Sequence, residues 1–226
     1  MSSANKLKLD EWKIISSKEV ETDLKTLSKQ KLEEEWIDAK VPSTVLGSLV
    51  QNGIYKDPYF GMNLKNIPAD QFEVPWIYRT EFQISEEQKS KTSILGINGI
   101  NYKANIWLNG DMIADQNVLH GAYRQFKFNV SEQIVIGNNT LVIEVIPPKP
   151  GDFTVGFVDW NPAPPDKNVG IFRDVYLNFN DGVSIENPFI ETELNLTNDR
   201  AAITVSSSVR NHLNRKVTGT LTAKIG

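Results

Sequence analysis

The sequence predicts an all-β protein built around an antiparallel β-sandwich. Apolar and polar residues alternate with a period of two, in segments of strand length that are rich in Ile, Val, Phe, Tyr and Trp. Turn-forming residues separate these segments, and the Asn109-Gly110 pair is the strongest hairpin signal in the chain. The regular succession of strands and long helices that builds a parallel sheet is missing from the pattern. This spacing of strands and turns therefore favours a sandwich.

Five segments in the middle of the chain carry the strand pattern. Each of them alternates or runs apolar over a length that suits one strand. They are residues 76–84, 92–98, 103–110, 123–130 and 139–146. The segment GIFRDVYLNF (170–179) predicts a further strand. Trp76 and Trp107 stand inside the strand pattern, so we expect both in the core.

One short helix is predicted over residues 42–53. Pro, Ser and Thr at its start form an N-terminal cap signal, and Asn52-Gly53 ends it. The apolar residues on one face of this helix are Val45, Leu46, Leu49 and Val50. The charged segment 17–36 is less clear, since its charge favours a helix while EVETDLKTLS (19–28) alternates like an edge strand. For that segment we expect the strand.

A domain boundary is expected near residues 184–187. Residues 1–184 would form the first sandwich, and fresh alternation begins after Pro188. The expected strands of this second part are residues 189–196, 201–209 and 217–225. An immunoglobulin-like sandwich needs about 100 residues and seven strands. Residues 185–226 are too few for that, so we expect a partial, truncated immunoglobulin-like domain.

Composition excludes several classes of function. The formal net charge is −4, from 24 basic and 28 acidic residues spread along the chain, so we expect no nucleic-acid partner. No apolar run approaches the roughly 20 residues of a membrane-spanning helix, and no membrane partner is expected. Cysteine is absent, and the two histidines, His120 and His212, stand far apart. We therefore expect no metal ligand among the site residues and no cofactor, while a structural calcium ion held by scattered Asp and Asn side chains stays open. MSSANKLKLDEW at the start shows no secretory signal.

The stretch GFVDWNPAPPDKNVGIFRDVYL (156–177) carries the strongest functional signal. It places Asp159 and Trp160 on a loop that is stiffened by proline, just ahead of a strand. The prolines on its far side are Pro162, Pro164 and Pro165. A surface connection needs no such stiffness, so we interpret the loop as a rigid support for a carboxylate and an indole that a partner outside this domain uses. Two simpler readings stay open: Asp159 caps a turn or pairs with Lys167, and Trp160 packs beneath the loop.

Six motifs then follow one another in a distinctive order. They are WIDAKVPSTVLGSLVQNGIYKDPYFGMN, PWIYRTEF, GINYKANIWLNG, GAYRQFKFNV, GNNTLVIEVIPP and DWNPAPPDKNVGIFRDVYL. This order resembles the N-terminal sugar-binding domain of glycoside hydrolase family 2, over residues 36–177. The Asp-Trp pair before the Pro-Pro loop is most similar to the branch of β-mannosidases, endo-β-mannosidases and exo-β-glucosaminidases.

The resemblance implies a jelly-roll-like, galactose-binding-domain-like sandwich, followed by the start of an immunoglobulin-like one. In the family, a later (β/α)8 barrel carries the two catalytic glutamates of a retaining mechanism. Such a barrel takes about 250 residues, which this chain cannot hold. The resemblance therefore implies a non-catalytic N-terminal part that supports an absent barrel and is inactive alone. Its expected partners are that barrel and a β-linked glycan, and family habit implies an exported parent protein.

The resemblance also implies a role for the loop. In the family, the loop ahead of GIFRDV reaches over the barrel mouth, and its Asp hydrogen-bonds sugar hydroxyls in the −1 subsite. Asp159 matches that position, and Trp160 would form an apolar wall beside it. Asp166 and Asn168 on the far limb are expected substrate-binding residues that leave the sugar preference open. The loop DPYFGMN (57–63) is a further candidate for approach to the active site.

Two alternatives come from other classes of function. A free-standing carbohydrate-binding module would need several planar aromatic residues on one exposed strand face, whereas most aromatic residues here fall at expected core positions. A structural or adhesive sandwich without a ligand is the other alternative. The rigid Asp159–Trp160 loop argues against it.

Overall fold

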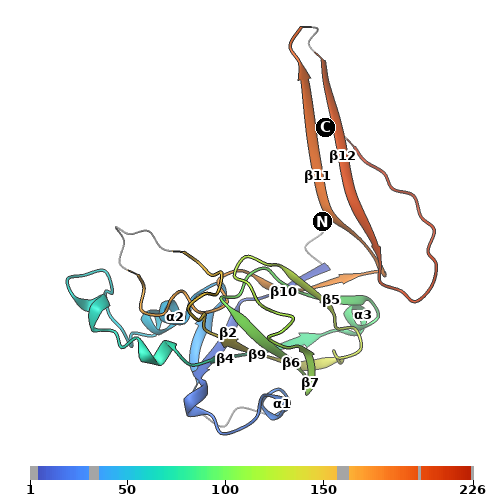
Figure 1. Cartoon of the computed structure of the whole chain (residues 1–226). Helices are drawn as coiled ribbons and strands as arrows, with labels where there is room; N and C mark the ends of the chain where they lie inside the picture. The colour runs from blue at the N-terminus through green and yellow to red at the C-terminus, as the bar shows by residue number, and fades with distance from the viewer. Residues whose placement is uncertain (1–4, 31–35, 157–162, 198–199, 225–226) are drawn as a thin grey trace. The chain divides into compact units, whose positions relative to one another are not determined.

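The computed structural model describes residues 5–30, 36–156, 163–197 and 200–224 of the chain (Figure 1). The chain divides into two compact units, Met1–Phe179 and Asn180–Gly226. The first unit contains two sheets and the second contains one hairpin.

The larger sheet of the first unit has six strands in the order β3-β2-β4-β9-β6-β7, and each neighbouring pair is antiparallel. The strands are β2 (Glu11–Ser16), β3 (Ile37–Lys40), β4 (Trp76–Ile84), β6 (Lys103–Leu108), β7 (Asp111–Ala114) and β9 (Gly137–Ile146). The long central pair β4–β9 runs in register from Trp76↔Val145 to Ile84↔Gly137.

The smaller sheet has four strands in the order β1-β10-β5-β8. They are β1 (Lys6–Leu9), β5 (Thr92–Ile97), β8 (Phe126–Asn129) and β10 (Val175–Asn180). The pairs β1–β10 and β5–β8 are antiparallel. The predicted all-β class and antiparallel sandwich are therefore confirmed.

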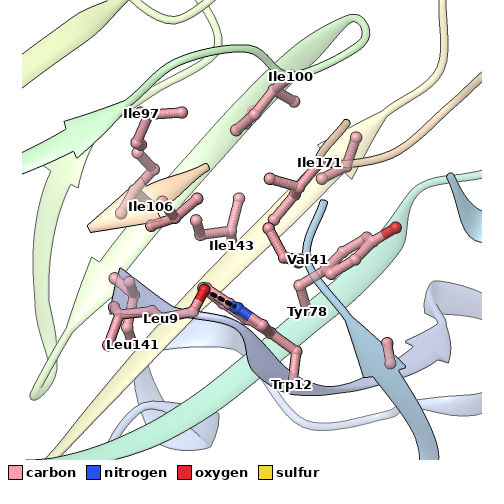
Figure 2. Close-up of a cluster of buried hydrophobic side chains, with 14 of the residues drawn as sticks. Leu9, Trp12, Val41, Tyr78, Ile97, Ile100, Ile106, Leu141, Ile143 and Ile171 are labelled. Atoms are coloured by element: carbon pink, nitrogen blue, oxygen red, sulfur yellow. Dashed lines mark hydrogen bonds between the residues drawn. The ribbon is translucent and has the colours of Figure 1, made fainter. Parts of the chain in front are cut away.

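One apolar core joins the two sheets. Leu9 and Ile97 of the smaller sheet lie in the same buried cluster as Ile106 and Ile143 of the larger one (Figure 2). Alternation decides which side chains enter it, because every second residue of β6 is buried. Trp12 is buried in this cluster and its indole Nε1 donates to the Leu9 carbonyl at 2.9 Å, so the ring packs without losing a hydrogen bond.

The hairpin between β6 and β7 confirms the strongest turn signal in the sequence. Asn109 and Gly110 have φ angles of 53° and 92°, and a two-residue turn that matches the twist of its strands needs positive φ at both positions. The Asn109 side chain also accepts from the Thr140 amide at 2.9 Å and donates to the Gln133 carbonyl at 2.9 Å. The turn is thereby fixed to the neighbouring strand.

The predicted helix is confirmed as α2 (Val45–Gln51). The Thr44 hydroxyl accepts from the Gly47 amide at 3.1 Å, and Asn52 caps the C-terminus ahead of Gly53. The other helical segments are short: η2 (Ser17–Glu19), α1 (Leu24–Leu27), η3 (Asn63–Asn66), η4 (Asp70–Phe72) and α3 (Glu86–Lys89).

The strand expected over residues 19–28 is wrong, because that segment forms η2 and α1. Asp23 starts α1 by accepting from both the amide and the hydroxyl of Thr26, at 3.0 and 2.9 Å. Leu24 and Leu27 lie three residues apart and pack on a second apolar cluster. The buried residues of that cluster are Ile15, Trp36, Ile77 and Val142.

Trp107 belongs to the edge of the second cluster rather than to the main core. Its side chain is only partly buried and packs against Val142 and its neighbours, whereas Trp76 is buried as predicted. Both residues stand in strands, but Trp107 points to the face that α1 covers. The strand pattern alone does not say which face of a sheet becomes the core.

The second unit is a two-stranded antiparallel hairpin of β11 (Val183–Asn195) and β12 (Arg200–Asn211). Its register shifts between Glu186 and Phe189, which marks a bulge. The strand expected over residues 217–225 is wrong, because the described residues 217–224 are not in a strand. Alternation makes a strand only where a neighbouring edge accepts its hydrogen bonds, and this segment pairs with none.

Candidate functional site

The base of the proline-rich loop meets the start of α2 at Asp166. This side chain is 1% exposed, and its two carboxylate oxygens have different partners. Oδ2 accepts from the Leu46 amide at 3.2 Å, and Oδ1 accepts from the Asn168 amide at 3.0 Å. Asp166 therefore fixes the first turn of the helix and its own loop together.

Burial raises the pKa of Asp166, because a charged carboxylate loses its hydration in the protein interior. Hydrogen bonds from the Thr44 side chain and from the Asn168 and Leu46 amides oppose that rise by favouring the charged form. Desolvation is the larger effect. A carboxyl group with these contacts is suited to holding backbone in place.

Asn168, the other predicted residue on this limb, lies at the edge of the loop and is half-buried. It has a φ of 56°, and Lys167 before it has a φ of 49°. Two consecutive non-glycine residues in the left-handed region are uncommon. Lys167 also places its ammonium 3.6 Å from the Glu73 carboxylate, in an exposed ion pair.

Asp159, Trp160 and Pro162 lie outside the described residues. The chain on both sides of them is described, up to Gly156 and from Ala163. The Pro164 carbonyl accepts from the Lys167 amide at 3.0 Å, which closes a turn on the far limb.

A groove of about 650 Å³ opens beside Asp166. Its floor and walls come from α2, from the loop that precedes η3, and from the limb 164–168. The lining residues are Thr44, Leu46, Gly47, Val50, Pro58, Tyr59, Leu64, Pro164, Asp166 and Asn168. Most of these residues are apolar, and a few polar side chains stand among them, a combination that small-molecule sites share.

Tyr59, which lines the groove, and the following residue Phe60 are unusually accessible. Tyr59 is 95% exposed and Phe60 is 76% exposed. Both belong to the DPYFGMN loop, which the sequence marked as a candidate. Aromatic rings that gain nothing from the core are suited to stacking on a sugar or packing on another protein surface.

Sequence reasoning missed Asn101, which lies at the base of the proline-rich loop, next to Lys167 and Asn168. Its side-chain amide donates to the carbonyls of Lys167 and Asn168, at 2.9 and 3.0 Å. The only sequence signal was its place in the motif GINYKANIWLNG, which gives no reason to connect it with a loop 66 positions later. The cluster at the loop base thus consists of Asn101, Asp166 and Asn168.

Among the described residues, no group of three or more His, Asp or Glu side chains is placed to hold a metal ion. Within that same part of the chain, no helix is long and apolar enough to span a bilayer. The groove places the polar side chains of Thr44 and Asn168 beside aliphatic residues and the exposed ring of Tyr59.

Comparison with known proteins identifies the family. Residues 16–150 match the glycosyl hydrolase 2 galactose-binding domain-like family. The exo-β-D-glucosaminidase of Amycolatopsis orientalis is 36% identical over 177 residues, which are 78% of this chain and 17% of that enzyme. The mannosylglycoprotein endo-β-mannosidase of Lilium longiflorum is 29% identical, over 63% of this chain and 17% of its own length.

Solved structures agree with the sequence matches. The exo-chitosanase CsxA of Amycolatopsis orientalis superposes with a TM-score of 0.87 and 34% identity, covering 93% of this chain and 25% of that one. A β-D-mannosidase of Dictyoglomus thermophilum gives a TM-score of 0.70 at 24% identity over 91% of this chain, and shares the fold. The chain spans only 17% to 24% of the length of the glucosaminidases that it matches. It belongs to the glycosyl hydrolase 2 galactose-binding domain-like family, as the order of its motifs predicted.

Proposed function

We propose that this chain is the non-catalytic N-terminal part of a retaining family 2 glycoside hydrolase that releases β-linked D-glucosamine or D-mannose from a glycan. The observation that carries the proposal is the groove beside Asp166. Around it the DPYFGMN loop, the start of α2 and the far limb of the Asp159–Trp160 loop come together. The similarity to exo-β-D-glucosaminidases supports glucosamine as the first sugar to test.

In this proposal the loop contributes side chains to a sugar site that the barrel completes. Asp159 accepts hydrogen bonds from two sugar hydroxyls, and Trp160 packs against the apolar face of the ring. Asn168 contacts the sugar from the groove edge. Asp166 was expected to bind substrate as well, but its contacts with the Leu46 and Asn168 amides support an indirect role, through the backbone that it holds.

The test of this function uses the enzyme with its barrel attached, assayed on p-nitrophenyl β-D-glucosaminide and the matching mannoside. Asp159→Ala should lower kcat/KM roughly 10- to 100-fold, because a charged hydrogen bond to the substrate is lost. Asp111→Asn, an exposed change in β7, is the matched control and should leave kcat/KM unchanged. If the enzyme hydrolyses neither substrate, the proposed activity is refuted. An unchanged kcat/KM in Asp159→Ala would remove that residue from the site.

The 226-residue chain by itself should not hydrolyse glycosides, since the two catalytic glutamates belong to the barrel.

A free-standing carbohydrate-binding module is the alternative. Among the described residues, only Phe189 of the strongly exposed aromatic side chains stands in a strand, while Tyr59, Phe60, Tyr123 and Phe153 lie outside the strands. That distribution disfavours a planar sugar platform on a sheet. Calorimetric titration with glucosamine, mannose and β-linked oligosaccharides separates the two: no heat near millimolar concentration supports a site that needs its barrel, and micromolar binding supports the module.

For residues 185–226 we propose the opening of an immunoglobulin-like domain. The register of the hairpin supports this, because Ile185↔Val209 and Ile190↔Val205 pair on one face. These side chains are exposed, as expected of a sheet whose partner sheet is supplied by further strands. A longer chain with about seven strands in this domain should bury them, which amide exchange along β12 would detect.

A further inference from the structure

Asn101 contacts two segments on either side of Asp159 and Trp160: residues 152–156, called here the ascending limb, and residues 163–170, called the descending limb. Its side chain is 0% exposed. On the descending limb, Nδ2 donates to the Lys167 carbonyl at 2.9 Å and to the Asn168 carbonyl at 3.0 Å. On the ascending limb, the Thr154 hydroxyl donates to Oδ1 of Asn101. One side chain thus holds both limbs at once.

The backbone of Asn101 is engaged with the same loop. Its amide donates to the Gly170 carbonyl at 3.0 Å, and the Gly170 amide donates back to the Asn101 carbonyl at 3.1 Å. Every polar group of Asn101 therefore bonds to the loop. A side chain with one acceptor and two donors at this reach is an asparagine, because aspartate would aim a second oxygen at two carbonyls and glutamine is one carbon too long.

The loop needs such a clamp because of its own conformation. Lys167 and Asn168 both adopt left-handed φ angles, which side-chain-bearing residues seldom adopt unless their surroundings hold them there. Asn101 holds the carbonyls of this pair, and Asp166 holds the Asn168 amide from the other side. The two contacts together hold Lys167 and Asn168 in this conformation.

We propose that Asn101 is a positioning residue for sugar binding, acting through the loop whose two limbs it ties together. This inference rests on the proposed function for its consequence in catalysis. The clamp itself rests only on described residues. By closing the base of the loop before substrate arrives, it reduces the conformational entropy that binding would otherwise cost.

The first experiment tests the clamp in the 226-residue chain by hydrogen exchange of the Lys167 and Asn168 amides. Thr154→Val removes the hydroxyl on the opposite limb, and Thr154→Ser keeps it as the matched control. We expect exchange at these two amides to rise roughly tenfold in the valine variant and to stay at the wild-type rate in the serine variant. Equal rates in all three chains, or equal acceleration in both variants, would overturn the clamp.

The second experiment tests the consequence in the barrel-containing enzyme with p-nitrophenyl β-D-glucosaminide. Asn101→Ala and Thr154→Val should each lower kcat/KM severalfold, and each should lower it by a smaller factor in an Asp159→Ala background, because both act through the loop that carries Asp159. A merely structural role would reduce activity equally in both backgrounds, and that additivity would overturn the positioning role. An Asp159→Ala variant with unchanged kcat/KM would instead overturn the proposed sugar contact. Faster amide exchange at Lys167 and Asn168 in Thr154→Val would still establish the clamp.

Discussion

The carboxylate of Asp166 accepts a hydrogen bond from the Leu46 amide at 3.2 Å, across 120 positions of sequence. This contact joins the candidate loop to the first turn of α2, whose apolar face packs into the main core. The loop is therefore anchored to a helix that packs into the main core. A substitution of Asp166 should therefore change both the free energy of unfolding and the conformation of the loop.

Replacing Asp166 with alanine should lower the free energy of unfolding by about 1–3 kcal/mol. The reason is that the Leu46 and Asn168 amides would lose their acceptor while they stay shielded from water. Urea denaturation at neutral pH measures the change. Asp111→Ala, at an exposed position, serves as the control and should alter stability by less than about 0.5 kcal/mol. Equal stability of the two variants would contradict this account of Asp166.

The stability should also depend on pH through Asp166. Its pKa in the folded chain is raised above the ordinary value of 3.8, so the folded state holds this proton more tightly than the unfolded state does. The stability that the protonated Asp166 carboxyl contributes to the folded state is therefore fully present below pH 3.8. It is lost as the pH rises through the raised pKa of the folded chain. Urea titrations of the wild type and of Asp166→Asn over this range should show the wild type losing stability relative to the variant. Parallel curves would exclude this linkage.

Arg79 should stabilise the segment that covers the outer face of the larger sheet. Its side chain is 4% exposed, and it donates to the carbonyl of Leu27, the last residue of α1, at 3.1 Å and to the Gln30 carbonyl at 2.7 Å. Arg79→Met keeps most of the apolar stem but removes the donors, and we expect a loss of about 1–3 kcal/mol. Amides of α1 should exchange faster in that variant. Lys13→Met, which breaks an exposed ion pair with Asp38, should change stability by less than about 1 kcal/mol.

Gly96 should not tolerate a side chain. A Cβ atom at this position would lie 2.3 Å from Cζ of Tyr176, whose ring crosses the outer face of β5. Gly96→Ala should therefore cost about 1–3 kcal/mol by thermal or urea unfolding, and adding Tyr176→Ala should recover part of the loss. Gly219→Ala meets open space and should be neutral. A neutral Gly96→Ala would mean that the Tyr176 ring moves aside without cost.

Local chemistry made much of this fold predictable. The Asn109-Gly110 turn, the Thr44 cap and the period-two strands act over a few residues, so each can be recognised in the sequence alone. The segment 19–28 shows the limit, because Asp23 capping a turn outweighed an alternation that looked like a strand. Trp107 shows another, since the choice between two buried faces depends on which segment later covers the sheet.

The candidate site was predictable only in part. Proline content and the family resemblance directed attention to residues 156–177. They could not assign Asp166 to the α2 backbone or connect Asn101 with Thr154, because those contacts join residues that are distant in sequence. Tyr59 and Phe60 were candidates from their motif, but their exposure follows only from how the loop leaves the core. Long-range hydrogen bonds and exposure are properties of the folded chain.

The hairpin of β11 and β12 should affect how this protein behaves in concentrated solution. Two long strands with unpaired outer edges and exposed isoleucine and valine side chains form a template on which another chain can add. Concentrated solutions should therefore self-associate through β11 and β12, and light scattering should fall when Ile190 and Val205 are replaced with lysine. A chain that ends after Phe179 should stay monodisperse, which makes it the better starting material for crystals of the sandwich.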